Sequence, residues 1–302
     1  MNPDLVAIGG FVLLFALMLL RVPIGIAMGL IGVAGFGLLG DLGPALKLLS
    51  QSPIRTATEA GFGVIPMFLL MGAIASASGM SRELFQAANS FLGHLRGGLG
   101  MATVAACAGF AAISGSSVAT AATFSAVAYP EMRRHNYPQS FATGVIAAGG
   151  TLGAMIPPSL VLAVYGIITQ QDIGRLYVAG IVPGILAATM YILTITAIAL
   201  ARPKYLPLGT RSSWRDRLIA LRHVWAITLL FIFVIGGLYG GMFTATEAAS
   251  MGAGGAFVIS VARRKLTRPQ FVECLVNPAQ HRFQRNAGIL PDFNQAPIDS
   301  GN

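Results

Sequence analysis

The uncharged stretch GGLGMATVAACAGFAAISGSSVATAATFSAVAYP, residues 97–130, decides how this chain folds. As a single α-helix its 34 residues would reach about 50 Å, at about 1.5 Å per residue, whereas the apolar core of a bilayer is about 30 Å thick. Its centre, Ile113-Ser114-Gly115-Ser116-Ser117, has the weakest helix propensity. Arg96 precedes the stretch and Arg133 and Arg134 follow it, so the positive-inside rule places both ends on the cytoplasmic side. The pattern predicts a re-entrant hairpin of two half-helices over about residues 97–130.

The composition explains why a bilayer is the relevant solvent. Charged residues make up 10% of the 302 residues and hydrophobic residues 55%, with a mean hydropathy of +0.71, whereas soluble chains have about 25% charged residues. Glycine is frequent, with 37 residues, as in closely packed membrane helices. A soluble fold is excluded, and the net charge of +9 is interpreted as membrane topology rather than nucleic-acid binding. Cys107 and Cys274 form no CxxC motif, which excludes a disulfide scaffold or a cysteine metal site.

The next apolar run, from Pro138 to Gln171, is also too long for one regular crossing. It is interrupted by Ile156-Pro157-Pro158-Ser159, which follows Gly149-Gly150-Thr151-Leu152-Gly153. Two prolines remove two backbone donors and clash with the preceding turn. The run is therefore predicted to be a discontinuous helix over about residues 138–171. Its non-helical backbone has to be buried in protein or line a cavity.

Charge-poor runs predict eight membrane segments, one of them re-entrant, with the N-terminus outside. The runs are Leu5–Leu20, Ile24–Leu39, Val64–Ala77, Leu99–Tyr129, Phe141–Thr169, Leu176–Leu200, Val224–Tyr239 and Glu247–Val261. With this topology the cytoplasmic loops hold 15 Lys and Arg residues and the external loops three, as the positive-inside rule requires. The first run is expected to be retained as a helix, because Asp4 and the lack of an A-x-A site argue against a signal peptide.

Two further stretches have an amphipathic pattern, and a third segment is rich in basic residues. Ser81–Leu95 sets apolar residues (Leu84, Phe85, Ala88, Phe91 and Leu92) on one helical face, which predicts a helix lying in the membrane interface. Ala45–Gly61 has a weaker pattern that Pro53 is expected to interrupt. The basic segment before the last apolar runs is predicted to be a cytoplasmic linker.

The chain is expected to contain an inverted repeat. Each half begins with an apolar helix, a short turn and a helix rich in small residues, and the two halves start on opposite sides of the membrane. The predicted divisions are a first repeat (1–201), the linker (202–223), the start of a second repeat (224–268) and a polar tail (269–302). The predicted fold class is therefore an all-α polytopic membrane protein.

The hairpin tip and the proline break are the candidate site. Half-helix ends, free carbonyls and hydroxyls that converge at two breaks could hold an alkali cation and an anionic substrate group. The candidate residues are Ser114, Gly115, Ser116, Ser117, Gly149, Gly150, Thr151, Gly153, Pro157, Pro158 and Ser159. If the breaks share a cation, the oxygens of Ser114, Ser116 and Thr151 should converge. The alternative is that these residues only satisfy backbone groups and permit close packing.

Other chemistries have weaker support. The glycine-rich segment at 149–153 has no GK[ST] and follows no strand, so it is no phosphate loop. Glu247 is interpreted as a helix-capping acid rather than a proton relay. An intramembrane protease would need a histidine base or paired aspartates inside the spans, and the sequence has neither. A channel is disfavoured because no ring of charged residues is present. The chain is not expected to be an enzyme.

Several motifs resemble one transporter family. They are Ile113–Ala122, Tyr129-Pro130-Glu131-Met132-Arg133-Arg134, Gly149–Gly153 with Ile156–Ser159, Ala179-Gly180-Ile181-Val182-Pro183-Gly184, and Phe243-Thr244-Ala245-Thr246-Glu247-Ala248-Ala249. In this order they resemble the large membrane subunit of TRAP (tripartite ATP-independent periplasmic) transporters over about residues 3–270. The resemblance implies an elevator-type secondary transporter of the bacterial inner membrane. It also implies a sodium site formed by the tip and the break, with sodium as coupling ion and no other cofactor. The implied partners are a small membrane subunit and a periplasmic protein that delivers organic acids such as C4-dicarboxylates.

The end of the chain departs from the family pattern. Family members carry a complete second repeat with its own hairpin, whereas residues 269–302 are polar and contain no spanning run. The chain is therefore expected to be truncated at its C-terminus. Two functions stay open: the permease subunit of a sodium-coupled importer of organic acids, and a non-transporting remnant or scaffold subunit.

Overall fold

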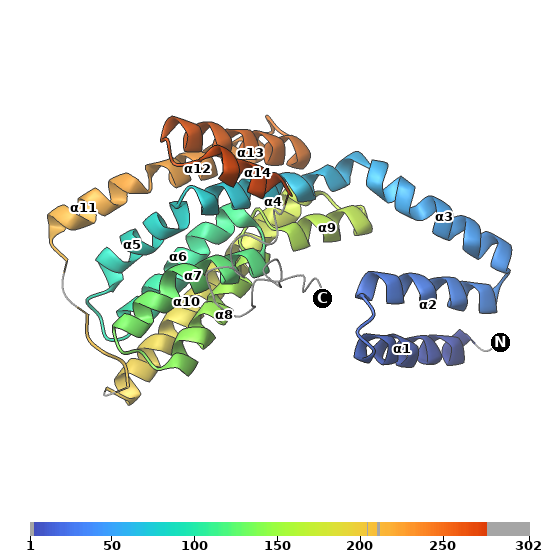
Figure 1. The fold of residues 1–302 in the computed structure, drawn as a ribbon, viewed down its shortest axis with the longest axis horizontal. Coiled ribbons are helices and arrows are strands. Elements are labelled where there is room, and N and C mark those ends of the chain that lie inside the picture. The colour runs from blue at the N-terminus through green and yellow to red at the C-terminus, as the bar shows by residue number, and fades with distance from the viewer. Residues whose placement is uncertain (1–2, 204, 210–211, 277–302) are drawn as a thin grey trace, which may run out of the picture. The chain divides into compact units, whose positions relative to one another are not determined.

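The computed structural model describes residues 3–203, 205–209 and 212–276, and in this part of the chain every regular element is a helix (Figure 1). Two compact units are present, Met1–Phe62 and Gly63–Asn302. The all-α fold predicted from the composition is confirmed. The repeat boundaries predicted at residues 201, 223 and 268 concern internal homology and stay predictions, and most of the predicted tail lies outside the described residues.

The first unit consists of three consecutive helices. Helix α1 (Pro3–Leu19) packs against α2 (Ile24–Leu39), and α2 packs against α3 (Leu42–Thr58). The first two coincide with predicted apolar runs, and their large apolar side chains are mostly exposed, as suits a lipid environment. The interruption expected at Pro53 is wrong, because α3 continues through it. A proline removes only its own backbone donor, and one lost hydrogen bond can be absorbed by a bend.

The second unit contains the predicted hairpin and broken helix. Its helices are α4 (Val64–Ala77), α5 (Met80–Leu92), α6 (Gly98–Ser114), α7 (Ser117–Arg134), α8 (Gln139–Met155), α9 (Leu160–Thr169), α10 (Ile173–Ala201), α11 (Trp214–His223), α12 (Trp225–Tyr239), α13 (Ala245–Ala262) and α14 (Arg268–Val276), with a 3-10 turn at Ala60–Gly63 before α4. Each predicted membrane run in this part corresponds to one helix or to a pair of helices.

Length and apolarity identify the candidate spans among the described residues. Gln139–Thr169 (31 residues) and Ile173–Ala201 (29 residues) are each long enough to cross a membrane. Two bent pairs, α4 with α5 and α11 with α12, raise the number of candidate spans to four. Helices α1, α2 and α6 are apolar but shorter. The total of eight membrane segments stays a prediction.

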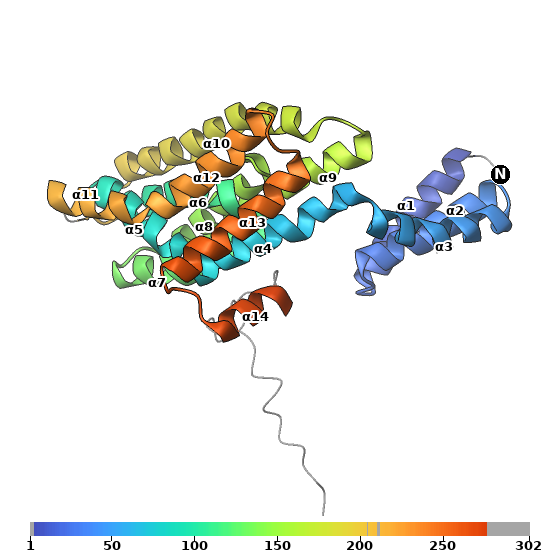
Figure 2. The ribbon, with the colours of Figure 1, turned by 90° about the horizontal axis from the view of Figure 1, so that it is seen from above.

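Helix α6 forms the centre of the second unit. Most of its residues are buried, and it packs against α4, α5, α7, α8 and α10. Small residues make this possible because they let neighbouring backbones approach closely. Figure 2 shows α12, α13 and α4 side by side in the same unit, and α13 packs against both neighbours.

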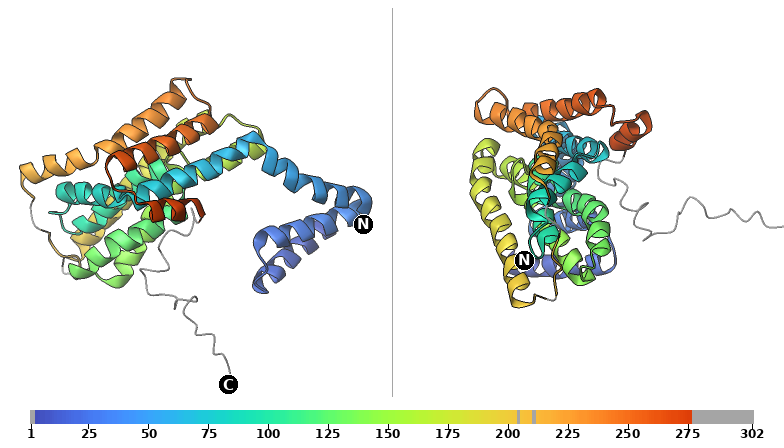
Figure 3. Two further views of the ribbon diagram at one scale, coloured as in Figure 1. Left: turned by 45° about the horizontal axis from the view of Figure 1, so that its top comes forward. Right: turned by 90° about the vertical axis from the view of Figure 1, so that its left-hand side faces the viewer.

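Helix α10 carries an apolar face that is open to its surroundings. Its exposed large apolar side chains follow a helical spacing of three, four or seven residues, with Ile185 and Leu186 adjacent. Each of them is at least half exposed: Val178, Val182, Ile185, Leu186, Met190, Leu193 and Leu200. At about 1.5 Å per residue this stripe is about 33 Å long, close to the bilayer core of about 30 Å. Figure 3 shows α10, in yellow, at the outside of its unit. The stripe is what a lipid-facing helix requires.

Helix α5 is amphipathic as expected, and it packs against α6 and α11. Its position in the membrane interface stays a prediction. Arg217 of α11 lies over the rings of Phe91 (5.7 Å) and Trp214 (4.8 Å), and its Nε donates to the carbonyl of Ser90 (3.1 Å). The apolar pattern of α5 is used for helix packing, and the basic linker contains a capped helix rather than only a loop.

Candidate functional site

The hairpin turns at Gly115. This residue ends α6 in the left-handed conformation, with φ of 60°, and its N–H donates to the carbonyl of Ala111 (3.0 Å). At the other end of the hairpin, the Leu99 N–H donates to the hydroxyl of Tyr137, just after α7 (3.4 Å). Both ends of the 97–130 stretch therefore lie together, and the predicted fold-back is confirmed.

The second break lies where the prolines predicted it. Helix α8 ends at Met155, and the chain resumes as α9 at Leu160. The Ser159 hydroxyl donates to the carbonyl of Ala154 (2.7 Å) and accepts the N–H of Leu162 (3.4 Å), so it joins the end of one helix to the start of the next. Pro157, Pro158 and Ser159 are all buried, which satisfies the requirement that irregular backbone at membrane depth be covered.

The two breaks are in direct contact. The carbonyl of Gly115 accepts a hydrogen bond from the N–H of Leu160 (2.9 Å). A Cβ at Gly115 would lie 2.7 Å from the carbonyl oxygen of Pro158, and a Cβ at Gly153 would lie 2.6 Å from that of Ser116. Both distances are below any van der Waals contact, so the approach depends on glycine at both positions.

More glycines close the packing around the contact. A Cβ at Gly150 would lie 2.6 Å from the Cβ of Ala121, and one at Gly149 would lie 2.9 Å from Cys107 Sγ. Two further glycines belong to helices on either side. Gly72 of α4 would place a Cβ 2.9 Å from Ser114 Cα, and Gly180 of α10 would place one 2.8 Å from the carbonyl oxygen of Met155. The glycines predicted at 149–153 are thus packing residues, whatever further role they have.

Hydroxyl groups gather on the hairpin side of the contact. Ser114 Oγ and Thr120 Oγ1 are 2.7 Å apart and both residues are buried. Thr120 Oγ1 also donates to the carbonyl of Ser116 (2.8 Å), and the Ser116 hydroxyl caps α7 by accepting the N–H of Ala119 (3.3 Å). Ser117 begins α7 and is half-buried. Thr120 was missed in the sequence; the signal for it is its position one helical turn after Ser116.

Thr151 lies differently from the other predicted oxygen donors. It is exposed on α8, where its hydroxyl donates to the carbonyl of Ala148 (2.6 Å) and lies 3.0 Å from the Tyr191 hydroxyl of α10. The structure brings Gly115 and Ser116 into contact with the α8–α9 break through the backbone, and Ser114 lies beside them against Thr120 and Gly72. It places the Thr151 side chain against α10.

The helix ends give this contact its electrostatic character. The C-termini of α6 and α8 and the N-termini of α7 and α9 come together there. Helix C-termini present carbonyl oxygens with partial negative charge, and helix N-termini present N–H groups with partial positive charge. Such an arrangement suits a hard cation, which prefers oxygen ligands, next to a carboxylate.

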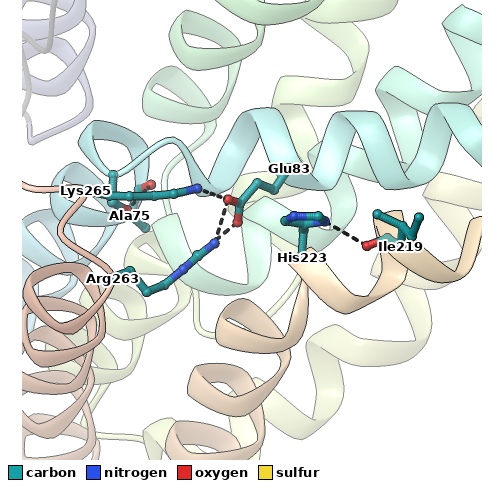
Figure 4. A network of polar contacts seen from close by, with 7 residues as sticks. Ala75, Glu83, Ile219, His223, Arg263 and Lys265 are labelled. Atoms are coloured by element: carbon teal, nitrogen blue, oxygen red, sulfur yellow. Dashed lines mark hydrogen bonds and ion pairs between the residues drawn. The ribbon is translucent and has the colours of Figure 1, made fainter. Parts of the chain in front are cut away.

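A buried ion-pair network lies outside the predicted site. Glu83 of α5 receives two hydrogen bonds from Arg263, at 3.0 and 2.7 Å, and one from Lys265 (Figure 4). The sequence offered a weak signal, an acid in an amphipathic helix and a distant Arg263-Arg264-Lys265 cluster.

Glu247, by contrast, accepts the N–H and the hydroxyl of Thr244 in a capping box, so its interpretation as a cap is confirmed.

Comparison with known proteins agrees with this geometry. The model of the family described as "Tripartite ATP-independent periplasmic transporter, DctM component" matches residues 11–283. The chain belongs to this family. The match reaches residue 283, further than the boundary near 270 expected from the motifs, so the start of the predicted non-family tail falls within it.

Curated relatives are TRAP permeases with different printed substrates. The C4-dicarboxylate TRAP transporter large permease protein DctM of Pseudomonas aeruginosa is 43% identical over 210 residues, which cover 69% of this chain and 47% of that protein. Its namesake in Vibrio cholerae is 37% identical, covering 83% of this chain and 54% of the relative. The isethionate TRAP transporter permease protein DctMQ of Oleidesulfovibrio alaskensis is 36% identical, covering 88% and 42%. The chain therefore spans about half the length of these relatives.

Proposed function

We propose that this chain is the permease component of a sodium-coupled importer of organic acids, working without ATP hydrolysis. The observation that carries the proposal is the contact between the two breaks, where the Gly115 carbonyl accepts the N–H of Leu160. Family membership supports a transport role. The site requires no bond-breaking chemistry, since it offers helix ends and hydroxyls rather than a nucleophile and a base.

The cation is assigned to the hairpin side of the contact. Sodium takes oxygen ligands, and the hydroxyls of Ser114 and Ser116 with the carbonyls at the end of α6 are the nearest supply. Thr151 is retained as a third donor, which requires its hydroxyl to leave the Tyr191 hydroxyl of α10. The N-termini of α7 and α9 would face the substrate carboxylate.

The relatives support the substrate class and the partners that we propose. Proteins named for C4-dicarboxylates are the most similar of those described above, so carboxylates are the proposed substrates. A small membrane subunit and a periplasmic substrate-binding protein are the proposed partners. The bacterial inner membrane is the proposed location, and no role in nucleic-acid binding is proposed.

Sodium-dependent uptake tests the proposal. The chain would be reconstituted in liposomes with the two partner subunits, and uptake of labelled succinate would be followed against sodium concentration. Ser114→Ala, Ser116→Ala and Thr151→Ala are expected to raise the sodium concentration needed for half-maximal uptake several-fold. Gly144→Ala is the matched control, because a Cβ there meets nothing within 4 Å. An unchanged sodium requirement in all three variants would contradict the assignment of the cation.

A second function is a scaffold subunit that does not transport. It is the alternative that the sequence left open. In the same liposomes, uptake by this chain would support the permease. Uptake only after addition of a longer family member would support the scaffold.

A further inference from the structure

The polar cavity beside the Glu83 network belongs to neither break. It has a volume of about 470 Å³ and lies between α4, α5, α7, the end of α11 and the segment around α14. Its lining includes Arg82, Glu83, His223 and Lys265, with the hydroxyls of Ser76 and Thr123 and the amide of Gln270. The proposed transport function leaves this cavity unexplained.

The charges around the cavity do not cancel. Glu83 is the carboxylate in the lining. Its two oxygens each accept a hydrogen bond from Arg263, and Oε1 also accepts one from Lys265. Arg82 has no ion-pair partner among the described residues, and the Lys265 side chain is 41% exposed. Three cationic side chains thus face one carboxylate, which leaves an excess of positive charge. Arg82 and Lys265 both line the cavity and are exposed, so an anion that enters it can pair with both side chains.

The hydrogen-bonding groups of the cavity match the same ligand. The ammonium group of Lys265 and the guanidinium of Arg82 can donate to the oxygens of an anion. The hydroxyls of Ser76 and Thr123 are hydrogen-bonded to each other (3.3 Å), so one of the two is left to donate to the anion. His223 Nδ1 donates to the carbonyl of Ile219 (2.7 Å), which orients the ring beside the network (Figure 4). These donors come from α4, α5 and α7 and from the loop after α13, so a bound anion would join them.

The position of the cavity along the chain selects the source of the anion. Arg82, His223 and Lys265 belong to segments that the distribution of Lys and Arg assigns to the cytoplasmic side of the membrane. Anionic lipids give that surface its negative potential, and basic pockets between helices on that side bind lipid head groups. We propose that this cavity binds the phosphate head group of an anionic phospholipid.

Lipid binding by the full chain in a neutral detergent tests the proposal. Native mass spectrometry would follow retention of phosphatidylglycerol and of phosphatidylcholine with matched acyl chains. One phosphatidylglycerol is expected to bind at least tenfold more tightly than phosphatidylcholine, and Arg82→Gln should remove most of this preference. Arg82 makes no ion pair within the described residues, so this variant is expected to fold normally, as thermal unfolding would check. Arg133→Gln is the matched control, because it removes the same charge from an exposed residue on the same predicted side.

Two outcomes would overturn the proposal. Equal lipid preference in Arg82→Gln and Arg133→Gln would show that the cavity is not the site. The other arm uses inorganic phosphate alone. A phosphate-induced rise in melting temperature that Arg82→Gln abolishes, without any preference for phosphatidylglycerol, would assign the cavity to a soluble anion instead of a lipid.

Discussion

The α6–α7 break and the α8–α9 break interrupt their helices in different ways. At the first the chain reverses direction at one glycine with φ of 60°. At the second two prolines stop a helix, and α8 and α9 together still form one candidate span of 31 residues. Both following helices begin with a serine that accepts the N–H three residues later, Ser116 in one case and Ser159 in the other. A reversal needs a residue that tolerates positive φ, whereas an interruption needs only the loss of backbone donors.

Single prolines elsewhere in the chain make the comparison sharper. Pro130 lies inside α7 and Pro183 lies inside α10, and neither ends its helix. Two adjacent prolines at 157 and 158 do end α8. One missing donor is tolerated, while two consecutive ones, with their clashes against the preceding turn, are not.

The largest effect is expected for Gly115→Ala. The left-handed conformation alone costs about 1–2 kcal/mol for a residue with a Cβ, and the new Cβ would lie 2.7 Å from the Pro158 carbonyl oxygen. The melting temperature of the purified protein should fall strongly and uptake should be lost. Gly144→Ala, on the open side of α8, should leave both almost unchanged. A normal melting temperature for Gly115→Ala would show that the reversal does not depend on glycine.

Gly153→Ala is expected to have the next largest effect. Its backbone is helical, so the cost comes only from the clash of the new Cβ with the Ser116 carbonyl, 2.6 Å away. Overpacking of this kind costs about 1–3 kcal/mol. Thermal unfolding should therefore place this variant between Gly115→Ala and wild type. A lower melting temperature for Gly153→Ala than for Gly115→Ala would mean that the contact between the two breaks contributes more to stability than the left-handed turn at Gly115.

The two capping serines should differ by a smaller amount. Ser159 is fully buried, and its hydroxyl makes two hydrogen bonds across the break, whereas Ser116 is half-buried and makes one. Loss of a helix cap lowers the free energy of unfolding by about 0.5–2 kcal/mol. We expect the loss for Ser159→Ala to lie near the upper end of this range and the loss for Ser116→Ala near the lower end. Melting temperatures of both variants check the order. Equal decreases in melting temperature would show that the additional hydrogen bond from Ser159 to the Ala154 carbonyl does not contribute to stability.

The smallest effect is expected for Tyr191→Phe. This change removes the hydroxyl that lies 3.0 Å from Thr151 Oγ1 at an exposed position, and an exposed hydrogen bond contributes about 0.5–1.5 kcal/mol at most. Stability should hardly change. The sodium requirement should stay at the wild-type value or fall slightly, because the Thr151 hydroxyl is released toward the breaks. An increase would indicate that Tyr191 itself holds Thr151 in a working position.

Local chemistry made much of this structure predictable. The hairpin followed from an uncharged run too long for one crossing, and the broken helix followed from Pro157 and Pro158. Both conclusions rest on sterics and on the length of a helix, which act within a few residues. Pro53 is the counterexample, because a single missing donor did not interrupt α3.

Contacts between distant segments were not predictable in the same way. Nothing near Glu83 in the sequence indicates Arg263 or Lys265, which follow about 180 residues later and meet it only in the folded chain. The packing of α5 against α11 was not predicted from its apolar face, since sequence periodicity cannot distinguish a lipid surface from a neighbouring helix. The Thr151 hydroxyl was expected to face the tip, but the rotation of α8 about its axis directs it to Tyr191.

The close approach of glycines around the breaks has a mechanical consequence. The hairpin tip touches α8 and α9 through backbone atoms, while Gly72 brings α4 and Gly180 brings α10 against the same region. Where helices are in contact through their backbone atoms, no flexible side chains lie between them that could adopt new rotamers and let one helix slide past the other. Helices α4, α6 to α9 and α10 should consequently be displaced as one rigid body, with the hinges located in segments that lack such contacts.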